Sequence, residues 1–158
     1  MRKLAVSLYL WLLLMGAAQA QPSCPAPPVS ASDLASATAS PELEPARLML
    51  GQAVTVGLHP VGDVRFVNAP AKRPNVSSYG GMLAVDARDA GTYQVSLSAG
   101  AWIDMLKDGA PVASTAHDHG AQCSASAKMV SFALQPGRHV IQLSGNKDDT
   151  IRVMVDRK

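Results

Sequence analysis

Aromatic residues, glutamate and cysteine are all scarce in this 158-residue sequence. Phe, Trp and Tyr together make up 4% of it, and the two glutamates, Glu42 and Glu44, lie close together in the N-terminal third. The sequence also lacks a GxSxG nucleophile elbow and a glycine-rich phosphate loop followed by a helix. No catalytic residue is assigned for these reasons, and whether the chain is an enzyme stays open.

Only one long hydrophobic run is present, and it lies at the N-terminus. Residues 4–15 are apolar, Arg2 and Lys3 precede them, and the following segment ends in small residues up to Ala20. This order of a basic, an apolar and a small-residue region is typical of a secretory signal peptide. The run is shorter than the roughly 18 to 20 residues that span a bilayer. We therefore predict a cleavable signal peptide at residues 1–20 and a periplasmic or secreted product.

The charge of the remaining chain is balanced. The full sequence has 14 Lys and Arg and 12 Asp and Glu, and loss of Arg2 and Lys3 leaves 12 of each sign. Nucleic acids and anionic membranes attract proteins that have a clustered positive charge. We therefore expect no nucleic-acid partner and no membrane association after the signal peptide is removed.

The two cysteines, Cys24 and Cys123, both follow the predicted leader. An exported chain meets an oxidising compartment, where two thiols commonly form a disulfide. A bridge across about 100 residues would stabilise the fold by roughly 4 to 5 kcal/mol in the chain-entropy view. A free thiol or a metal ligand at Cys123 is the alternative. Lipidation at Cys24 is disfavoured because residues 21–23 lack the aliphatic residue of a lipobox.

The composition and the hydrophobic pattern of the sequence change near residue 47. Residues 21–46 are rich in Pro, Ala and Ser, which predicts a disordered tether or a loosely docked arm, because such a segment buries little apolar surface. Residues 47–158 alternate short apolar and polar stretches, which predicts a single antiparallel, all-β sandwich or jelly roll of eight or nine strands. The expected strands are residues 52–58, 64–66, 82–86, 92–98, 101–107, 111–115, 128–134, 138–144 and 150–155.

Local signals refine this prediction. Asp108 and Gly109 form a two-residue hairpin signal. Tyr93, Val95 and Leu97 share one face of their strand and are expected to point into the core. Residues 117–126 are expected to form a loop.

Residues 81–155 carry a resemblance to known proteins. GTYQVSL from Gly91, the Asp108-Gly109 pair and FALQPG from Phe132 follow the GxYxVxL, DG and LxPGxYxLxV order of prepeptidase C-terminal domains. The resemblance implies a jelly-roll domain of the kind appended to secreted enzymes.

The elements AWID, HDHG and PGRH are also similar to those of small exported bacterial β-sandwich proteins that are often labelled homogentisate 1,2-dioxygenase. That label implies an iron site centred on His117 and His119. A cupin-like metal motif places a glutamate after its His-x-His pair, and this chain has no glutamate after Glu44.

His117 and His119 are the candidate metal ligands, because residues two apart on an extended segment face the same side. Two imidazoles could contribute to a site for iron, zinc or copper. A third ligand would have to come from elsewhere, and the donors available are Asp104, Cys123, His139 and His59. The alternative is a polar loop whose two histidines are exposed to solvent.

Trp102 and Asp104 are the candidate ligand-binding residues. They alternate with Ile103 and Met105, so one pair faces the core and the other lies on the opposite face. An outward Trp102 could stack on a sugar face, and an inward one would pack in the core. His139 alternates in phase with inward residues and is expected to be a hydrogen-bonded core histidine.

Two functions follow from these observations. The first is a non-enzymatic exported module, without a cofactor, that binds a partner protein, a glycan or a small ligand. The second is a small metal-dependent protein, such as a dioxygenase, that uses His117 and His119 with one divalent metal.

Overall fold

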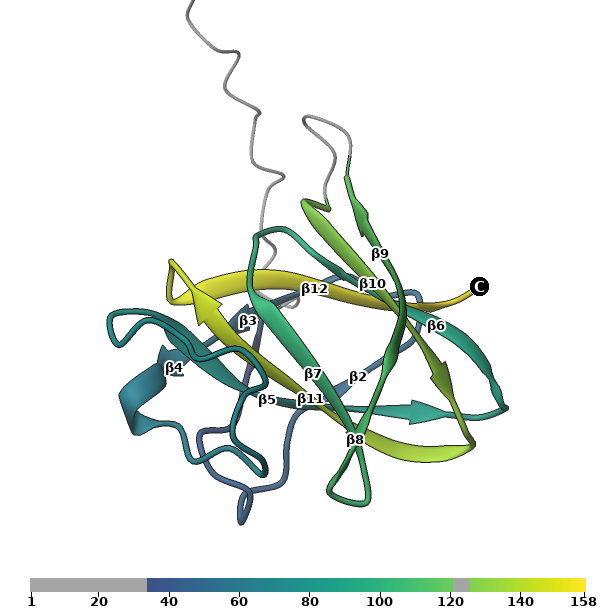
Figure 1. Ribbon diagram of the computed structural model, residues 1–158, viewed down its shortest axis with the longest axis horizontal. Helices are drawn as coiled ribbons and strands as arrows, with labels where there is room; N and C mark the ends of the chain where they lie inside the picture. The colour runs from purple at the N-terminus through teal and green to yellow at the C-terminus, as the bar shows by residue number, and fades with distance from the viewer. Residues whose placement is uncertain (1–33, 121–125) are drawn as a thin grey trace, which may run out of the picture.

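The computed structural model describes residues 34–120 and 126–158, which form two β-sheets packed face to face (Figure 1). Sheet A contains, in spatial order, β1 (Leu34–Ser36), β3 (Val54–Gly57), β12 (Thr150–Arg157), β6 (Gly91–Leu97), β10 (Lys128–Leu134) and β9 (Ser114–His119). Sheet B contains β2 (Arg47–Leu48), β5 (Tyr79–Ala87), β11 (Gly137–Asn146), β7 (Trp102–Lys107) and β8 (Ala110–Val112), with β4 (His59–Pro60) also paired to β5. A short 3₁₀ turn, η2 (Val61–Asp63), follows β4.

The all-β sandwich class is therefore confirmed, with two differences in detail. The described residues hold twelve strands rather than eight or nine. The sheets are mixed rather than purely antiparallel, because β1 pairs with β3 and β2 pairs with β5 in parallel. Neither described range contains an α-helix, and so neither contains a helix able to span a membrane.

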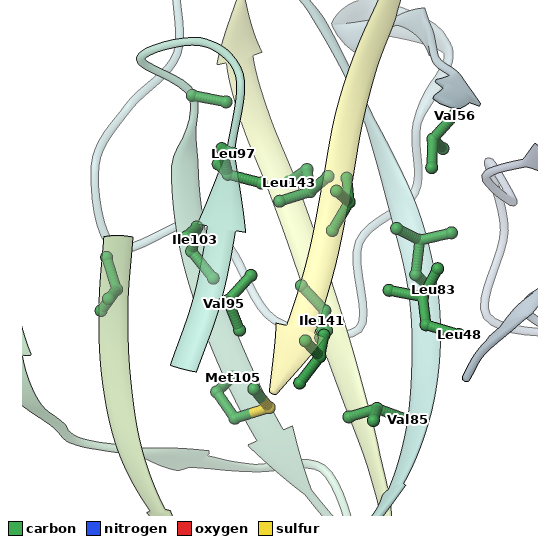
Figure 2. Packing of buried hydrophobic residues seen from close by; sticks show 14 of the residues in the cluster. Leu48, Val56, Leu83, Val85, Val95, Leu97, Ile103, Met105, Ile141 and Leu143 are labelled. Atoms are coloured by element: carbon green, nitrogen blue, oxygen red, sulfur yellow. The ribbon is translucent and has the colours of Figure 1, made fainter. Parts of the chain in front are cut away.

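The core lies between the sheets and follows the predicted alternation (Figure 2). Tyr93, Val95 and Leu97 are at most 1% exposed, as expected for inward residues of β6. The inward residues of the other long strands are Val56, Leu83, Val85, Ile103, Met105, Val130, Phe132, Leu134, Ile141, Leu143, Ile151, Val153 and Val155. Burying these side chains contributes roughly 1.5 to 3 kcal/mol for each large one, and it fixes the register of each strand.

The prediction of a tether over residues 21–46 is wrong for residues 34–46. β1 pairs with β3, and Ala37 is 3% exposed in the core. A Cβ atom placed on Gly81 would lie only 2.5 Å from the Cβ of Ala37 and would clash with it. The close contact between the two residues therefore depends on glycine at position 81. Composition misled here because small residues in this segment fit against glycine without needing large apolar side chains. Residues 21–33 lie outside the described ranges.

Two local predictions are also wrong. Residues 64–66 form no strand, because η2 turns the chain and Val64 donates its backbone N–H to Val61 O. Residues 117–119 are not a loop but the end of β9, paired with β10. The Asp108–Gly109 hairpin turn is confirmed, with φ angles of 50° and 78° that suit a two-residue turn between twisted strands.

The segment that follows η2 covers the outer face of sheet B and is held there by Gln142. The side-chain amide of Gln142, which is 1% exposed, accepts from Asn68 N at 3.2 Å and donates to Asn68 O at 3.1 Å. Asn68 Nδ2 donates in turn to Gly109 O at 2.7 Å. This double clamp places residues 69–75 beside β7.

Candidate functional site

The candidate site is a cleft at the edge of β7. β8 pairs only with residues 105–107 of β7, so residues 102–104 have no strand neighbour on that side within the described ranges. At this point a cleft of about 360 Å³, here called the mouth cleft, opens between sheets A and B. Its lining residues are Ala71, Trp102, Ile103, Asp104, Met105, Pro111, Val112, Ala113, Ser114, His117, Lys128, Val130 and Phe132.

Trp102 and Asp104 lie together at the rim of the mouth cleft. Ile103 and Met105 are the core pair, 7% and 1% exposed, so Trp102 and Asp104 face the other side of sheet B. Trp102 Nε1 donates to Asp104 Oδ1 at 2.9 Å, and Ala71 N donates to Asp104 Oδ2 at 3.2 Å. Both carboxylate oxygens are thus engaged in holding the indole and the neighbouring loop, which gives Asp104 a positioning role.

Lys128, at the start of β10, reaches across the cleft to sheet B. Its Nζ donates to Ala101 O at 2.8 Å and lies 5.0 Å from the centre of the Trp102 ring. Lys72 Nζ lies 5.9 Å from the same ring centre. Burial lowers the pKa of Lys128, and the nearby positive charge of Lys72 lowers it further, against an opposing effect of Asp104.

His117 and His119 project to the same face of β9, as expected for alternate residues of a strand. In register, His117 lies opposite Val130 and His119 lies opposite Lys128. His117 Nε2 is 2.8 Å from Ser114 Oγ, and both residues line the mouth cleft. Sequence reasoning missed this link between a serine and a histidine, because the β-bulge in the β9–β10 pairing is not visible in the residue pattern.

Of the other expected metal ligands, Asp104 lines the mouth cleft with His117 but accepts from Trp102 and Ala71, and His59 and His139 lie elsewhere. His59 Nε2 is 2.8 Å from Ala37 O, and His139 is 1% exposed within β11. Cys123, together with Cys24 and the predicted leader, lies outside the described ranges. Among the residues that the structure describes, no group of three His, Cys, Asp or Glu side chains could hold a metal ion.

His139 is the core histidine that its alternation predicts. Its Nδ1 lies 3.1 Å from Gly137 O, which accepts the ring N–H, while Nε2 has no hydrogen-bond partner among the described residues. Burial is the largest influence on its pKa and lowers it from the usual value, which favours the neutral ring.

Three cations near the cleft, Lys72, Arg73 and Lys128, were not identified from the sequence. Lys72 and Arg73 lie in the segment clamped by Gln142, and Lys128 begins a strand on the other sheet. No sequence pattern links positions so far apart, and the only available signal was a pair of adjacent basic residues.

Comparison with known proteins adds no relative, since no protein family, curated protein or solved structure matches this chain. The resemblances noted in the sequence therefore stay predictions.

Proposed function

We propose that this chain is an exported, non-enzymatic binding module that holds a small ligand in the mouth cleft. The observation that carries the proposal is the cleft of about 360 Å³ between the two sheet edges. Its volume lies at the lower end of the roughly 300 to 1,000 Å³ that small-molecule sites occupy. Apolar walls with a few polar groups at the rim are the usual composition of such sites.

The lining of the cleft supports a ligand with an apolar body. Its walls include Ile103, Val112 and Phe132, whose side chains offer no hydrogen bonds. The polar lining residues are Trp102, Asp104, Ser114, His117 and Lys128. Such an arrangement buries an apolar ring or chain and orients it through its polar end.

The polar groups of the rim favour binding over catalysis. Both oxygens of Asp104 accept hydrogen bonds from neighbouring groups. Ser114 and His117 form a hydrogen-bonded pair, but within the described residues no carboxylate contacts the other ring nitrogen of His117. A serine nucleophile needs a base that is oriented by such a third group.

A neutral apolar probe tests the proposal. The full chain is expressed with export, and the product is purified and its mass is measured, which also tests cleavage after Ala20. The product is then titrated with the fluorescent probe N-phenyl-1-naphthylamine. We expect saturable binding at one site, and Ala113→Trp, which fills the cleft, should weaken it by about tenfold.

Ala110→Trp is the matched control, because Ala110 is exposed on the same hairpin and does not line the cleft. Binding to this variant should stay within about twofold of the parent. Equal affinity in the Ala113→Trp variant, with an unchanged circular dichroism spectrum, would refute the proposal. So would a lack of saturable binding, or a stable dimer that excludes the probe.

A further inference from the structure

A second, smaller hollow adjoins the mouth cleft and shares Trp102 and Lys128 with it. This basic hollow has a volume of about 150 Å³. Its lining residues are Lys72, Arg73, Pro74, Asn75, Gly100, Trp102, Lys128, Ser144 and Gly145. Three of the nine lining residues are cations, and none carries a carboxylate.

The three cations of the basic hollow are not neutralised by an ion pair. Within residues 34–120 and 126–158, no carboxylate oxygen lies within 4.0 Å of the charged nitrogens of Lys72, Arg73 or Lys128. The ammonium groups of Lys72 and Lys128 both lie within 6 Å of the Trp102 ring centre. The attraction of each ammonium group to the Trp102 ring offsets part of the repulsion between Lys72 and Lys128. An anion bound between the two ammonium groups would offset more of this repulsion.

Ser144 is a buried polar residue behind the basic hollow. It is 1% exposed, lines the basic hollow, and its Oγ has no hydrogen-bond partner among the described residues. A buried hydroxyl without a partner costs roughly 1 to 3 kcal/mol. The Oγ atom is closed to solvent, so the hydroxyl lies behind the surface of the hollow and is not itself a contact for a ligand.

We infer that the ligand of the mouth cleft is a small organic anion whose charged group is held in the basic hollow by Lys72, Arg73 and Lys128. This inference rests on the proposed function and names the chemical class of its ligand. A carboxylate, sulfonate or phosphate can accept hydrogen bonds from all three cations. Its apolar body lies on the other side of Trp102, against the walls of the mouth cleft.

The geometry of the two spaces fits one molecule of this kind. Trp102 and Lys128 line both spaces, so an anionic group beside Lys128 is continuous with an apolar body in the cleft. Asp104 acts on Lys128 through its charge, but its two oxygens accept from Trp102 and Ala71 and it forms no ion pair with the three cations among the described residues. The three cations and Asp104, whose charge acts on Lys128, sum to a net charge of +2 (three minus one), which a neutral apolar molecule would not balance.

A matched pair of dyes tests the inference. The neutral probe N-phenyl-1-naphthylamine and 8-anilino-1-naphthalenesulfonate share one ring system and differ by a sulfonate. At low ionic strength we expect the sulfonate dye to bind the exported product about tenfold more tightly than the neutral dye. Added sodium chloride should reduce this ratio, because salt screens charges that are accessible to water.

The charge-removing variant is Lys72→Met/Arg73→Met, because both residues are exposed and neither packs in the core. In this double variant, the ratio of the affinities for the sulfonate dye and the neutral dye should fall close to one. Lys128→Met is less suitable alone, because it also removes the hydrogen bond to Ala101 O. Lys147→Met is the matched control, since Lys147 is an exposed cation outside both spaces, and it should keep the parent ratio.

Each remaining outcome has a defined meaning. Equal affinity for the two dyes would overturn the inference and leave the proposed function standing, whereas no binding of either dye would overturn both. If the ratio of the two dye affinities fell equally in Lys147→Met, the preference for the sulfonate dye would come from general surface charge, and the anion site in the basic hollow would be refuted. Sodium benzoate should displace the sulfonate dye. If sodium phosphate or sulfate displaced the dye equally well, the ligand would be a free inorganic anion, and the inference of an organic anion would be refuted.

Discussion

The indole Nε1 of Trp102 donates a hydrogen bond to Oδ1 of Asp104, two residues further along β7, at 2.9 Å. The other oxygen of the same carboxylate accepts from Ala71 N at 3.2 Å. One side chain therefore fixes both the aromatic wall of the mouth cleft and the loop that carries Lys72. This relationship connects the two spaces of the candidate site.

Replacement of Asp104 tests this connection. Asp104→Ala leaves the Trp102 and Ala71 N–H groups without their acceptor, and we expect the free energy of unfolding to fall by about 1 to 2 kcal/mol. Urea denaturation followed by circular dichroism measures the loss. Asp104→Asn, which keeps one acceptor oxygen, should lose less, and an Asp104→Ala variant as stable as the parent would contradict the positioning role.

The clamp of Gln142 on Asn68 leads to a second prediction. Gln142→Leu removes both hydrogen bonds and leaves two backbone groups of Asn68 unsatisfied, which should destabilise the fold by about 1 to 3 kcal/mol. The Asn68 amide should exchange faster with deuterium. Gln94→Leu is the control, because the half-buried Gln94 side chain makes no hydrogen bond within the described residues. Equal effects of the two variants would argue against the clamp.

His139 should make the stability of the protein depend on pH. Burial lowers its pKa in the folded state below the unfolded value near 6.5. Between these two pKa values the unfolded chain binds more protons, so the free energy of unfolding falls as the pH drops through 6.5. The nearby charges of Lys107, Asp108 and Asp86 modify the shift but are smaller influences than burial.

The variant His139→Gln tests this dependence, because glutamine does not titrate and can still donate to Gly137 O. Its free energy of unfolding should fall less between about pH 7.5 and pH 5 than that of the parent. The exposed His119, changed to glutamine, is the control and should keep the parental slope. A His139→Gln variant with the same slope as the parent would show that another group is responsible.

Metal analysis separates the binding module from the metal-dependent alternative. Lys128 lies directly opposite His119 in the β9–β10 register, and a cation at that position opposes binding of a second cation. We expect the exported product to contain no stoichiometric iron, zinc or copper. His117→Ala/His119→Ala should then melt at the parental temperature with or without added zinc. Stoichiometric metal that disappears in this double variant would favour the alternative.

The cysteine pair remains a prediction that thiol chemistry can test. β1 and β9 lie at opposite edges of sheet A, five strand spacings or about 24 Å apart. The ten residues from Cys24 to Leu34 span at most about 36 Å, so the N-terminal segment can reach that far. The denatured, unreduced product should show no free thiol. Two reactive thiols would contradict the Cys24–Cys123 disulfide.

Much of the sheet architecture could be predicted from local pattern. The alternation through Tyr93, Val95 and Leu97 specified a buried face, because the side-chain period of a strand is two. The Asp108–Gly109 turn followed from residues that adopt positive φ. Segment 34–46 could not be predicted in this way, since its role depends on a contact between Ala37 and the distant Gly81.

The sequence by itself determined the all-β class, most strand positions and the burial of His139, because these depend on residues adjacent along one strand. Which face of β7 carries Trp102, and the meeting of Lys72, Arg73 and Lys128 beside it, were decided only by the tertiary structure. The physical reason is that this site forms where the two sheets meet an outer loop. Its charges come from segments that only the hydrogen bonds of Gln142 and Asp104 and the packing of the core bring together.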